Sequence, residues 1–182
     1  MSLCKNCGKE ARVHLTDLDG KTNLYCMDCH NDLLADTIGI SHFKDYTRTY
    51  TVKRHTFEIQ LVMNPLGLLW EASETNGGYY FSLYAKLDSD PFVCLQELYT
   101  RINRGVSNKY LKKGERQYKY FLKSSKGIGR IEGGPDNYNN VPSIIIDGKK
   151  LTWEEFGRTI SVYEGHNLKF NLVDPGDDDG IV

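Results

Sequence analysis

The chain has 182 residues and a formal net charge of −1, with 40% hydrophobic and 26% charged residues. Such a composition is that of a folded globular protein and excludes wholesale disorder. No apolar stretch approaches the roughly 20 residues that cross a bilayer, and the first residues lack the apolar core of a secretory signal. We therefore predict a cytoplasmic protein with no membrane contact. A net charge near zero also excludes nucleic-acid binding through bulk positive charge.

Four of the five cysteines fall within the first thirty residues, as Cys4-x-x-Cys7 and Cys26-x-x-Cys29. Two such pairs supply the four thiolates that structural zinc takes, at about 2.3 Å each. Four protein thiolates leave no position open for water or substrate, so we predict one structural Zn²⁺ per chain and not a catalytic metal. A pair of disulfides or a redox role is a less favoured alternative, and His30 is a possible replacement ligand that we expect instead on a helix surface.

The residues between and after the cysteine pairs predict a small finger. Two β-prone runs, 12–16 and 22–25, flank Asp19-Gly20, which is a hairpin signal. Apolar residues at helical spacing predict a helix over 27–38. A knuckle, a hairpin and a knuckle that leads into a helix make a treble-clef or zinc-ribbon finger over residues 1–40. Lys5, Lys9 and Arg12 are placed to offset the charge of a tetrathiolate zinc centre.

The finger resembles a known type. Cys4-x-x-Cys7 followed by Ala11-Arg12-Val13-His14-Leu15-Thr16 and Leu24-Tyr25-Cys26-x-x-Cys29 is similar to the N-terminal zinc finger of the activator of bacterial protein-arginine kinase. It is similar, more loosely, to the zinc-binding domain of the ClpX unfoldase. The resemblance covers residues 4–34 and implies a finger that serves in dimerisation or in docking a protein partner. The helical continuation of the kinase activator is not evident here.

The rest of the chain predicts a second, α+β domain over 50–174, after a linker over 41–49. Alternating residues predict strands at 55–64, 68–72 and 79–87, with Asn76-Gly77-Gly78 as a hairpin signal. A helix with Asp90 as N-cap and Pro91 at its first position is expected to end at Gly105. Cys94 lies on its apolar face, as a buried thiol would.

Near the end of the chain, 143–146 predicts a buried strand closed by Asp147-Gly148. Thr152 and Glu155 form a capping box for a helix expected to stop at Gly165. Alternating Leu168, Phe170 and Leu172 predict a last strand, and 175–182 an acidic disordered tail. The region from Ile146 to Gly165 resembles an uncharacterised family of Gram-positive bacteria, in which it follows a zinc finger. That resemblance implies a bacterial cytoplasmic setting and no particular activity. The predicted fold class is α+β: a Cys₄ finger plus an antiparallel-sheet domain with two main helices.

The small net charge hides a segregation of charge along the chain. Residues 41–126 carry a net +6 and residues 127–182 a net −5. Basic residues interleaved with Tyr110, Tyr118, Tyr120 and Phe121 suit a single-stranded nucleic-acid groove. The candidate contacts are Arg101, Arg104, Lys109, Lys112, Lys113, Arg116, Lys119 and Lys123. The alternative, which we favour, is a solvated face whose lysines pair with acids of the last third. The glycine-rich run 127–134 lacks a GK[ST] ending, and we expect a flexible connection or an edge strand there.

Three functional hypotheses follow. The leading one is a zinc-binding adaptor or regulatory module that contacts a protein partner or forms a homodimer. The second is nucleic-acid binding through 101–126. The third is an enzyme, for which no catalytic set of residues is evident in the linear sequence.

Overall fold

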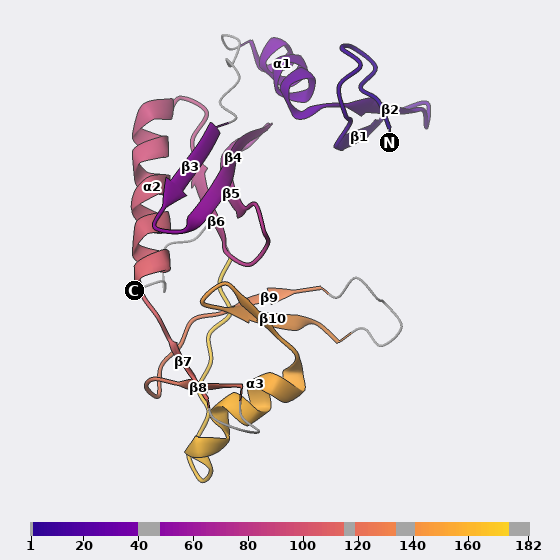
Figure 1. Cartoon of the computed structure of the whole chain (residues 1–182). Coiled ribbons are helices and arrows are strands. Elements are labelled where there is room, and N and C mark those ends of the chain that lie inside the picture. Colours follow the sequence, from indigo (N-terminus) through magenta and orange to yellow (C-terminus); the bar gives the residue numbers. More distant parts are fainter. Residues whose placement is uncertain (1, 40–47, 115–118, 134–140, 175–182) are drawn as a thin grey trace.

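The structure is a computed structural model that describes residues 2–39, 48–114, 119–133 and 141–174. It confirms the α+β class, with antiparallel sheets and three α-helices in the described residues. Figure 1 shows the finger, a central sheet with its helix, and a C-terminal part. The strands are β1 (Val13–Thr16), β2 (Thr22–Tyr25), β3 (Arg48–Val52), β4 (His55–Asn64), β5 (Gly67–Glu74), β6 (Tyr80–Ala85), β7 (Leu111–Lys113), β8 (Tyr120–Leu122), β9 (Arg130–Glu132), β10 (Ser143–Ile146) and β11 (Lys149–Leu151). The helices are α1 (Met27–Ile38), α2 (Pro91–Ser107) and α3 (Trp153–Ile160), and a 3₁₀ turn, η1, covers Ser161–Tyr163.

The central sheet is an antiparallel meander in the order β3-β4-β5-β6. On β4 the predicted alternation is confirmed, because Phe57, Ile59, Leu61 and Met63 are all buried while Glu58 between them is exposed. Strand residues point to opposite faces in turn, so this pattern buries one face of the sheet. The connection from β5 to β6 contains Gly77 and Gly78, both at positive φ, as the predicted hairpin requires.

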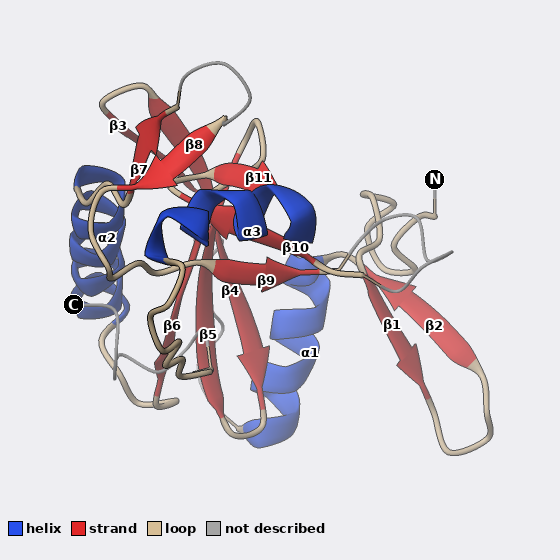
Figure 2. Cartoon of the chain, turned by 90° about the horizontal axis from the view of Figure 1, so that it is seen from below, coloured by secondary structure: helices blue, strands red, loops and turns tan. Residues whose placement is uncertain are grey.

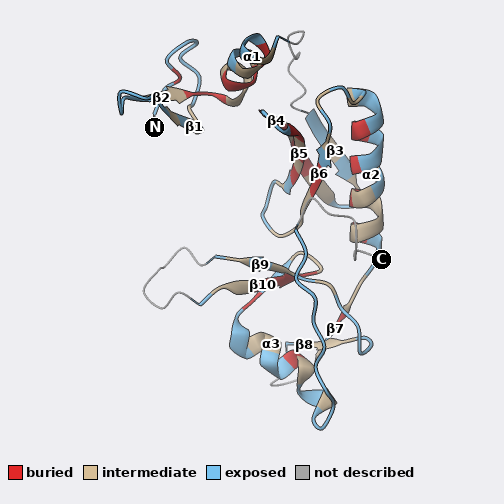
Figure 3. Ribbon diagram, turned by 180° about the vertical axis from the view of Figure 1, so that it is seen from behind, coloured by how far each residue is buried: buried red, intermediate tan, exposed pale blue. Residues whose placement is uncertain are grey.

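Helix α2 covers the buried face of this sheet. Its side chains Cys94, Leu95, Leu98, Ile102 and Val106 recur at helical spacing and belong to the same hydrophobic core as the sheet residues. The predicted N-terminus is confirmed, since the Asp90 carboxylate accepts a hydrogen bond from the Phe92 N–H at 2.8 Å. Figure 3 shows how the buried residues concentrate between α2 and the sheet.

The prediction that α2 ends at Gly105 is wrong, because the helix continues to Ser107. Gly105 serves packing and not termination. A Cβ at this position would lie 2.3 Å from Cε1 of Phe81, so only a glycine leaves room for that ring. A glycine at position 105 thus allows α2 and β6 to lie in close contact.

Helix α1 joins the finger to the central sheet. Ala35 is fully buried in the core of the sheet, and Leu34 and Ile38 pack against that core. Asn31 is buried as well, and its side chain hydrogen-bonds to the backbone of β4. The helix that begins at the second cysteine pair therefore ends inside the second hydrophobic core.

The C-terminal part has a smaller core of its own. Leu111, Ile144, Ile146 and Leu151 are buried together, and Phe156 of α3 packs against them. Figure 2 shows α3 lying across the short strands β8 to β11. The capping box is confirmed: the Thr152 hydroxyl accepts from the Glu155 N–H at 3.1 Å, and the Glu155 carboxylate accepts from the Thr152 N–H at 3.0 Å. Strand β9 is an edge strand next to β10, as one interpretation of the run 127–134 expected.

Two predictions for this part are wrong. Helix α3 stops at Ile160 and not at Gly165, because Ser161 begins the tighter η1 turn and its hydroxyl donates to the Arg158 carbonyl at 2.8 Å. Leu168, Phe170 and Leu172 form no strand, and their exposed fractions are 71%, 76% and 73%. Alternation alone does not make a strand where no neighbouring strand offers hydrogen bonds.

Most of the predicted linker and all of the predicted acidic tail lie outside the described residues, although 48 and 49 belong to β3. None of the helices in the described part of the chain has the length and apolar character that a membrane span requires.

Candidate functional site

The four N-terminal cysteines form one cluster. Their Sγ atoms all lie within 4.8 Å of one another, although Cys4 and Cys7 are about twenty residues from the other pair in sequence. The sulfurs of Cys7 and Cys26 are 3.5 Å apart. Cys26 is the N-cap of α1 and Cys29 lies in its first turn, so the helix fixes the second pair.

The first pair is held by backbone hydrogen bonds of the knuckle. The Gly8 N–H donates to the Cys4 carbonyl at 3.0 Å, and Gly8 has a φ of 72°, which a residue without Cβ adopts at no steric cost. The Lys5 N–H donates to the Leu24 carbonyl at 2.8 Å and ties the knuckle to β2. Both pairs are thereby attached to the β1–β2 hairpin.

The cluster has the dimensions of a tetrahedral metal site. A tetrahedron with Zn–S bonds of about 2.3 Å has S–S edges of about 3.8 Å; the Cys7 and Cys26 sulfurs are 3.5 Å apart, and every pair of sulfurs lies within 4.8 Å. A disulfide requires about 2.05 Å between sulfurs, and all five cysteines are free thiols here. The donor set consists of four sulfurs and contains no histidine.

The surroundings already favour a thiolate at one position. Burial raises the pKa of Cys4, but backbone N–H donors of Cys26, Cys7 and Asn6 outweigh it and lower the pKa to about 6. Burial raises the pKa of Cys26 and Cys29, and neighbouring thiols raise that of Cys29 further. A bound cation would lower the pKa of each of these thiols, because it favours the charged form of each ligand.

Two of the basic residues near the cluster, Lys9 and Lys5, have polar partners within the finger. Lys9 forms an ion pair with Asp28 at 3.0 Å, and this contact raises the pKa of Lys9. Cys26 and Cys7 add smaller Coulombic contributions in the same direction. The Lys5 ammonium donates to the Asn23 side chain at 3.1 Å.

The two histidines of the finger have different positions. His14 is an exposed residue of strand β1. The expectation that His30 lies on a helix surface is wrong, since it is 8% exposed. Burial lowers its pKa, which keeps the imidazole neutral, because desolvation disfavours the charged form. The side of α1 that carries His30 and Asn31 faces the protein and not the solvent.

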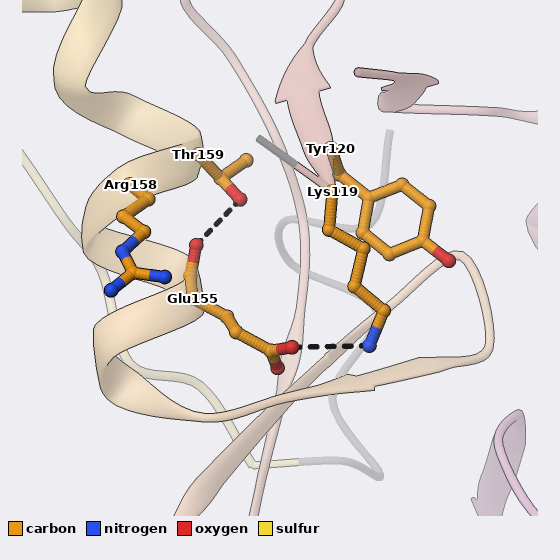
Figure 4. Close-up of a pocket in the computed structure, with 5 residues that line it drawn as sticks. All are labelled: Lys119, Tyr120, Glu155, Arg158 and Thr159. Atoms are coloured by element: carbon orange, nitrogen blue, oxygen red, sulfur yellow. Dashed lines mark hydrogen bonds and ion pairs between the residues drawn. The ribbon is translucent and has the colours of Figure 1, made fainter. Parts of the chain in front are cut away.

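The described residues of the basic segment 101–126 are divided between α2, β7, β8 and their connections. The guanidinium of Arg101 donates to the Ser82 carbonyl at 3.0 Å, and its side chain is only 11% exposed. Lys119 pairs with Glu155 at 3.1 Å, as the alternative of intramolecular ion pairs predicted. The two residues lie in a shallow pocket of about 210 Å³, lined by Lys119, Tyr120, Glu155, Arg158 and Thr159 (Figure 4).

The remaining candidates divide between several elements. Arg104 belongs to α2, while Lys112 and Lys113 are exposed on β7 and Lys123 follows β8. Arg116 lies outside the described residues. Lys109, between α2 and β7, is half-buried, and its ammonium donates to the Tyr79 hydroxyl.

Sequence reasoning missed three cations that the fold brings to Lys109. Lys53 and Arg54 form the β3–β4 turn, and Lys149 begins β11. The electrostatic environment of Lys109 contains all three, together with Asp147. Because they come from separate segments, no local pattern marks them as a group. The Asp147-Gly148 turn signal, which places Lys149, was the single local indication.

Three family models match consecutive parts of the chain. Each describes a domain of unknown function: DUF7685 over residues 3–41, DUF7686 over 45–107 and DUF7713 over 110–177. The first covers the finger with α1, the second the central sheet with α2, and the third the C-terminal part. No curated protein and no solved structure matches the chain. The resemblance to the kinase activator and to ClpX stays a prediction.

Proposed function

We propose that this protein is a cytoplasmic zinc-binding adaptor, in which one structural Zn²⁺ holds the finger together and the finger docks a protein partner or a second copy of the chain. Cys4, Cys7, Cys26 and Cys29 are the proposed ligands. The observation that carries the proposal is the convergence of four sulfurs within 4.8 Å, at the point where the hairpin and α1 meet.

Zinc is the metal that this donor set suits best. Four thiolates in a tetrahedral arrangement favour Zn²⁺ or iron–sulfur chemistry, and the paired Cys-x-x-Cys spacing is that of structural zinc. The buried cluster of the finger consists of Cys4, Tyr25 and Cys26 alone, with Val13, Leu15 and Cys29 partly buried against it. Metal binding, with an apparent free energy of about 10–16 kcal/mol, supplies the stability that this small core lacks. Free thiols also suit a reducing compartment, which supports the cytoplasm.

The shape of the finger supports docking. Strands β1 and β2 make a two-stranded sheet of their own, and the hairpin extends away from the central sheet in Figure 2. Leu18 near its tip is fully exposed, and Leu3 beside the knuckle is 63% exposed. Meanwhile α1 is anchored on β4 by Asn31. A hairpin that is held away from the body on an anchored helix is suited to contact another protein.

Metal analysis of the freshly purified chain tests the zinc site. We expect one zinc per chain and its loss in Cys7→Ser combined with Cys29→Ser. A native mass spectrum that shows no bound zinc, or iron in place of zinc, would remove the basis of the proposal.

Docking is tested with a hairpin variant. The tagged, zinc-loaded chain is used to capture partners from the native host, with a nuclease-treated arm, and its oligomeric state is measured by light scattering. We expect Leu18→Asp to abolish a partner band or a dimer. Leu66→Asp, at another highly exposed leucine, in the β4–β5 turn, should retain it. Equal behaviour of both variants would contradict docking through the finger.

A further inference from the structure

Four cations meet where the central sheet joins the C-terminal part of the chain. Lys53 and Arg54 come from the β3–β4 turn, Lys109 from the connection between α2 and β7, and Lys149 from the β10–β11 hairpin. We call Lys53, Arg54, Lys109 and Lys149 the junction cations. They come from segments almost one hundred residues apart in sequence, so the fold alone assembles them.

Close contacts hold these segments together. The Lys53 ammonium donates to the Ser107 hydroxyl, at the end of α2, at 3.1 Å. The Lys109 ammonium donates to the Tyr79 hydroxyl and lies 4.8 Å from the centre of that ring. Gly148, in the turn before Lys149, is so near Tyr79 that a Cβ there would lie 2.7 Å from the ring. Tyr79 is therefore the point where Lys109 and the β10–β11 turn meet.

The four junction cations outnumber the two carboxylates that act on this junction in the described residues, Asp147 and Glu74. None of the junction cations forms an ion pair there, whereas Lys119, Arg130 and Lys150 all do. The nearby Asp147 carboxylate accepts hydrogen bonds from the N–H groups of Tyr110 and Leu111. Glu74 is occupied by His55, at 2.6 Å.

The environment of Lys109 shows the same excess of positive charge. Burial lowers the pKa of Lys109, and the charges of Lys53, Arg54 and Lys149 lower it further, against the opposing effect of Asp147. An anion placed among these groups would relieve both their mutual repulsion and the cost of burying Lys109.

We propose that the junction cations bind the phosphodiester backbone of a single-stranded nucleic acid. Lysine ammonium groups bind phosphate as point charges, and the planar fork of the one arginine matches the geometry of phosphate oxygens. This site is independent of the zinc-dependent docking proposed above.

Two aromatic rings with a cation beside them lie on the neighbouring β7–β8 hairpin, Tyr120 on the face that packs against the C-terminal core and Phe121 on the opposite face. Lys149 lies 5.1 Å from the centre of the Tyr120 ring, and Lys112 lies 6.0 Å from that of Phe121. Lys112 and Phe121 are register partners on adjacent strands. Positive charge that tracks a backbone, beside aromatic rings for bases, is what single-stranded nucleic acid requires.

A salt titration with the full-length, zinc-loaded chain tests the site. Binding of a labelled oligothymidylate is measured by fluorescence anisotropy over a series of salt concentrations. The test variant is Arg54→Gln with Lys149→Gln. The matched control, Lys86→Gln with Lys150→Gln, also removes two exposed positive charges. Lys86 lies at the opposite end of the central sheet, and Lys150 forms an ion pair with Glu132. Far-UV circular dichroism and thermal unfolding establish that both variants are folded.

Each phosphate contact to a single strand contributes about 0.7 to the slope of log K against log salt. We expect the test variant to lose about 1.4 of slope and roughly 25-fold in affinity near 0.1 M salt, while the control keeps the slope of the unmodified chain. Equal losses in both variants, or no binding by the unmodified chain at low salt, would overturn the proposal. Displacement of the oligonucleotide by polyglutamate of equal charge would overturn it too, because the site would then accept any polyanion.

Discussion

The side chain of Asn31 in the finger hydrogen-bonds to the backbone of β4 at Met63, in the way that a neighbouring strand would. The Met63 N–H donates to Oδ1 of Asn31 at 2.9 Å, and Nδ2 of Asn31 donates to the Leu61 carbonyl at 2.7 Å. The pairing of β3 with β4 ends at Ile59, so these two backbone groups lie beyond the last strand contact. One amide side chain thus completes the hydrogen bonds of β4 and attaches the finger to it.

Asn31→Leu should destabilise the protein although it adds apolar surface. The substitution leaves the Met63 N–H and the Leu61 carbonyl without partners, and an unsatisfied buried group costs about 1–3 kcal/mol. We expect the free energy of unfolding, measured with urea, to fall by about 2–4 kcal/mol. Asn167→Leu, at an exposed position, should change it by less than about 0.5 kcal/mol. A similar effect of both substitutions would mean that the Asn31 hydrogen bonds contribute nothing.

Removal of the metal should weaken the hydrogen bonds of β4, although this strand is far from the cysteines in sequence. Cys26 and Cys29 begin α1, and the same helix ends in the core of the central sheet. A 12-residue helix is marginal without tertiary support, so chelation should loosen α1 and release Asn31. Hydrogen exchange is the measurement: the Met63 amide should lose protection in the chelated protein.

Amides of β5 provide the internal control, because this strand lies between β4 and β6. They should keep most of their protection when the metal is removed. Loss of protection at β5 equal to that at Met63 would indicate global unfolding instead of release of α1, and an unchanged Met63 would show that the metal does not support the contact.

Local patterns predicted the parts of the fold that local interactions determine. The cysteine spacing, the alternation on β4 and the Thr152–Glu155 capping box each depend on residues a few positions apart, and the structure has all three arrangements. Leu168 to Leu172 shows the limit of such reasoning. Their alternation is as regular as that of a strand, but strand formation also depends on a partner elsewhere in the chain.

Contacts between distant segments were not predictable in the same way. The junction cations meet only because two hairpin turns and the end of α2 converge. Asn31 did leave a signal, since it precedes Leu34, Ala35 and Ile38 by three, four and seven residues, on the same helical stripe. A polar residue on an apolar stripe indicates a buried hydrogen bond, and its partner on β4 required the structure.

Two glycines in helices should respond in opposite directions to alanine. A Cβ at Gly105 would collide with the Phe81 ring, which is confined by Phe57 and Tyr79, so we expect Gly105→Ala to destabilise the protein by about 1–3 kcal/mol. A Cβ at Gly157 of α3 would meet nothing within 4 Å, and Gly157→Ala should stabilise by about 0.5–1 kcal/mol. Thermal unfolding of both variants measures the difference. A destabilised Gly157→Ala protein would contradict the position of α3.

The capping box should make the C-terminal part sensitive to acid. Hydrogen bonding to the Thr152 N–H, and then to Lys119, lowers the pKa of Glu155 below its usual value. Because the folded pKa is lower than the unfolded one near 4.5, this carboxylate contributes its full stabilisation above that value, and the contribution is lost as the pH falls through the folded pKa. In Glu155→Gln the group no longer titrates. We therefore expect the difference in unfolding free energy between the unmodified chain and this variant to be about 1 kcal/mol at neutral pH and to shrink toward zero below pH of about 3.

Glu154→Gln, at the neighbouring position outside the capping box, serves as the control. Urea unfolding from neutral pH down to acid measures both, and a difference for Glu155→Gln that does not change with pH would show that its carboxylate is not the stabilising form.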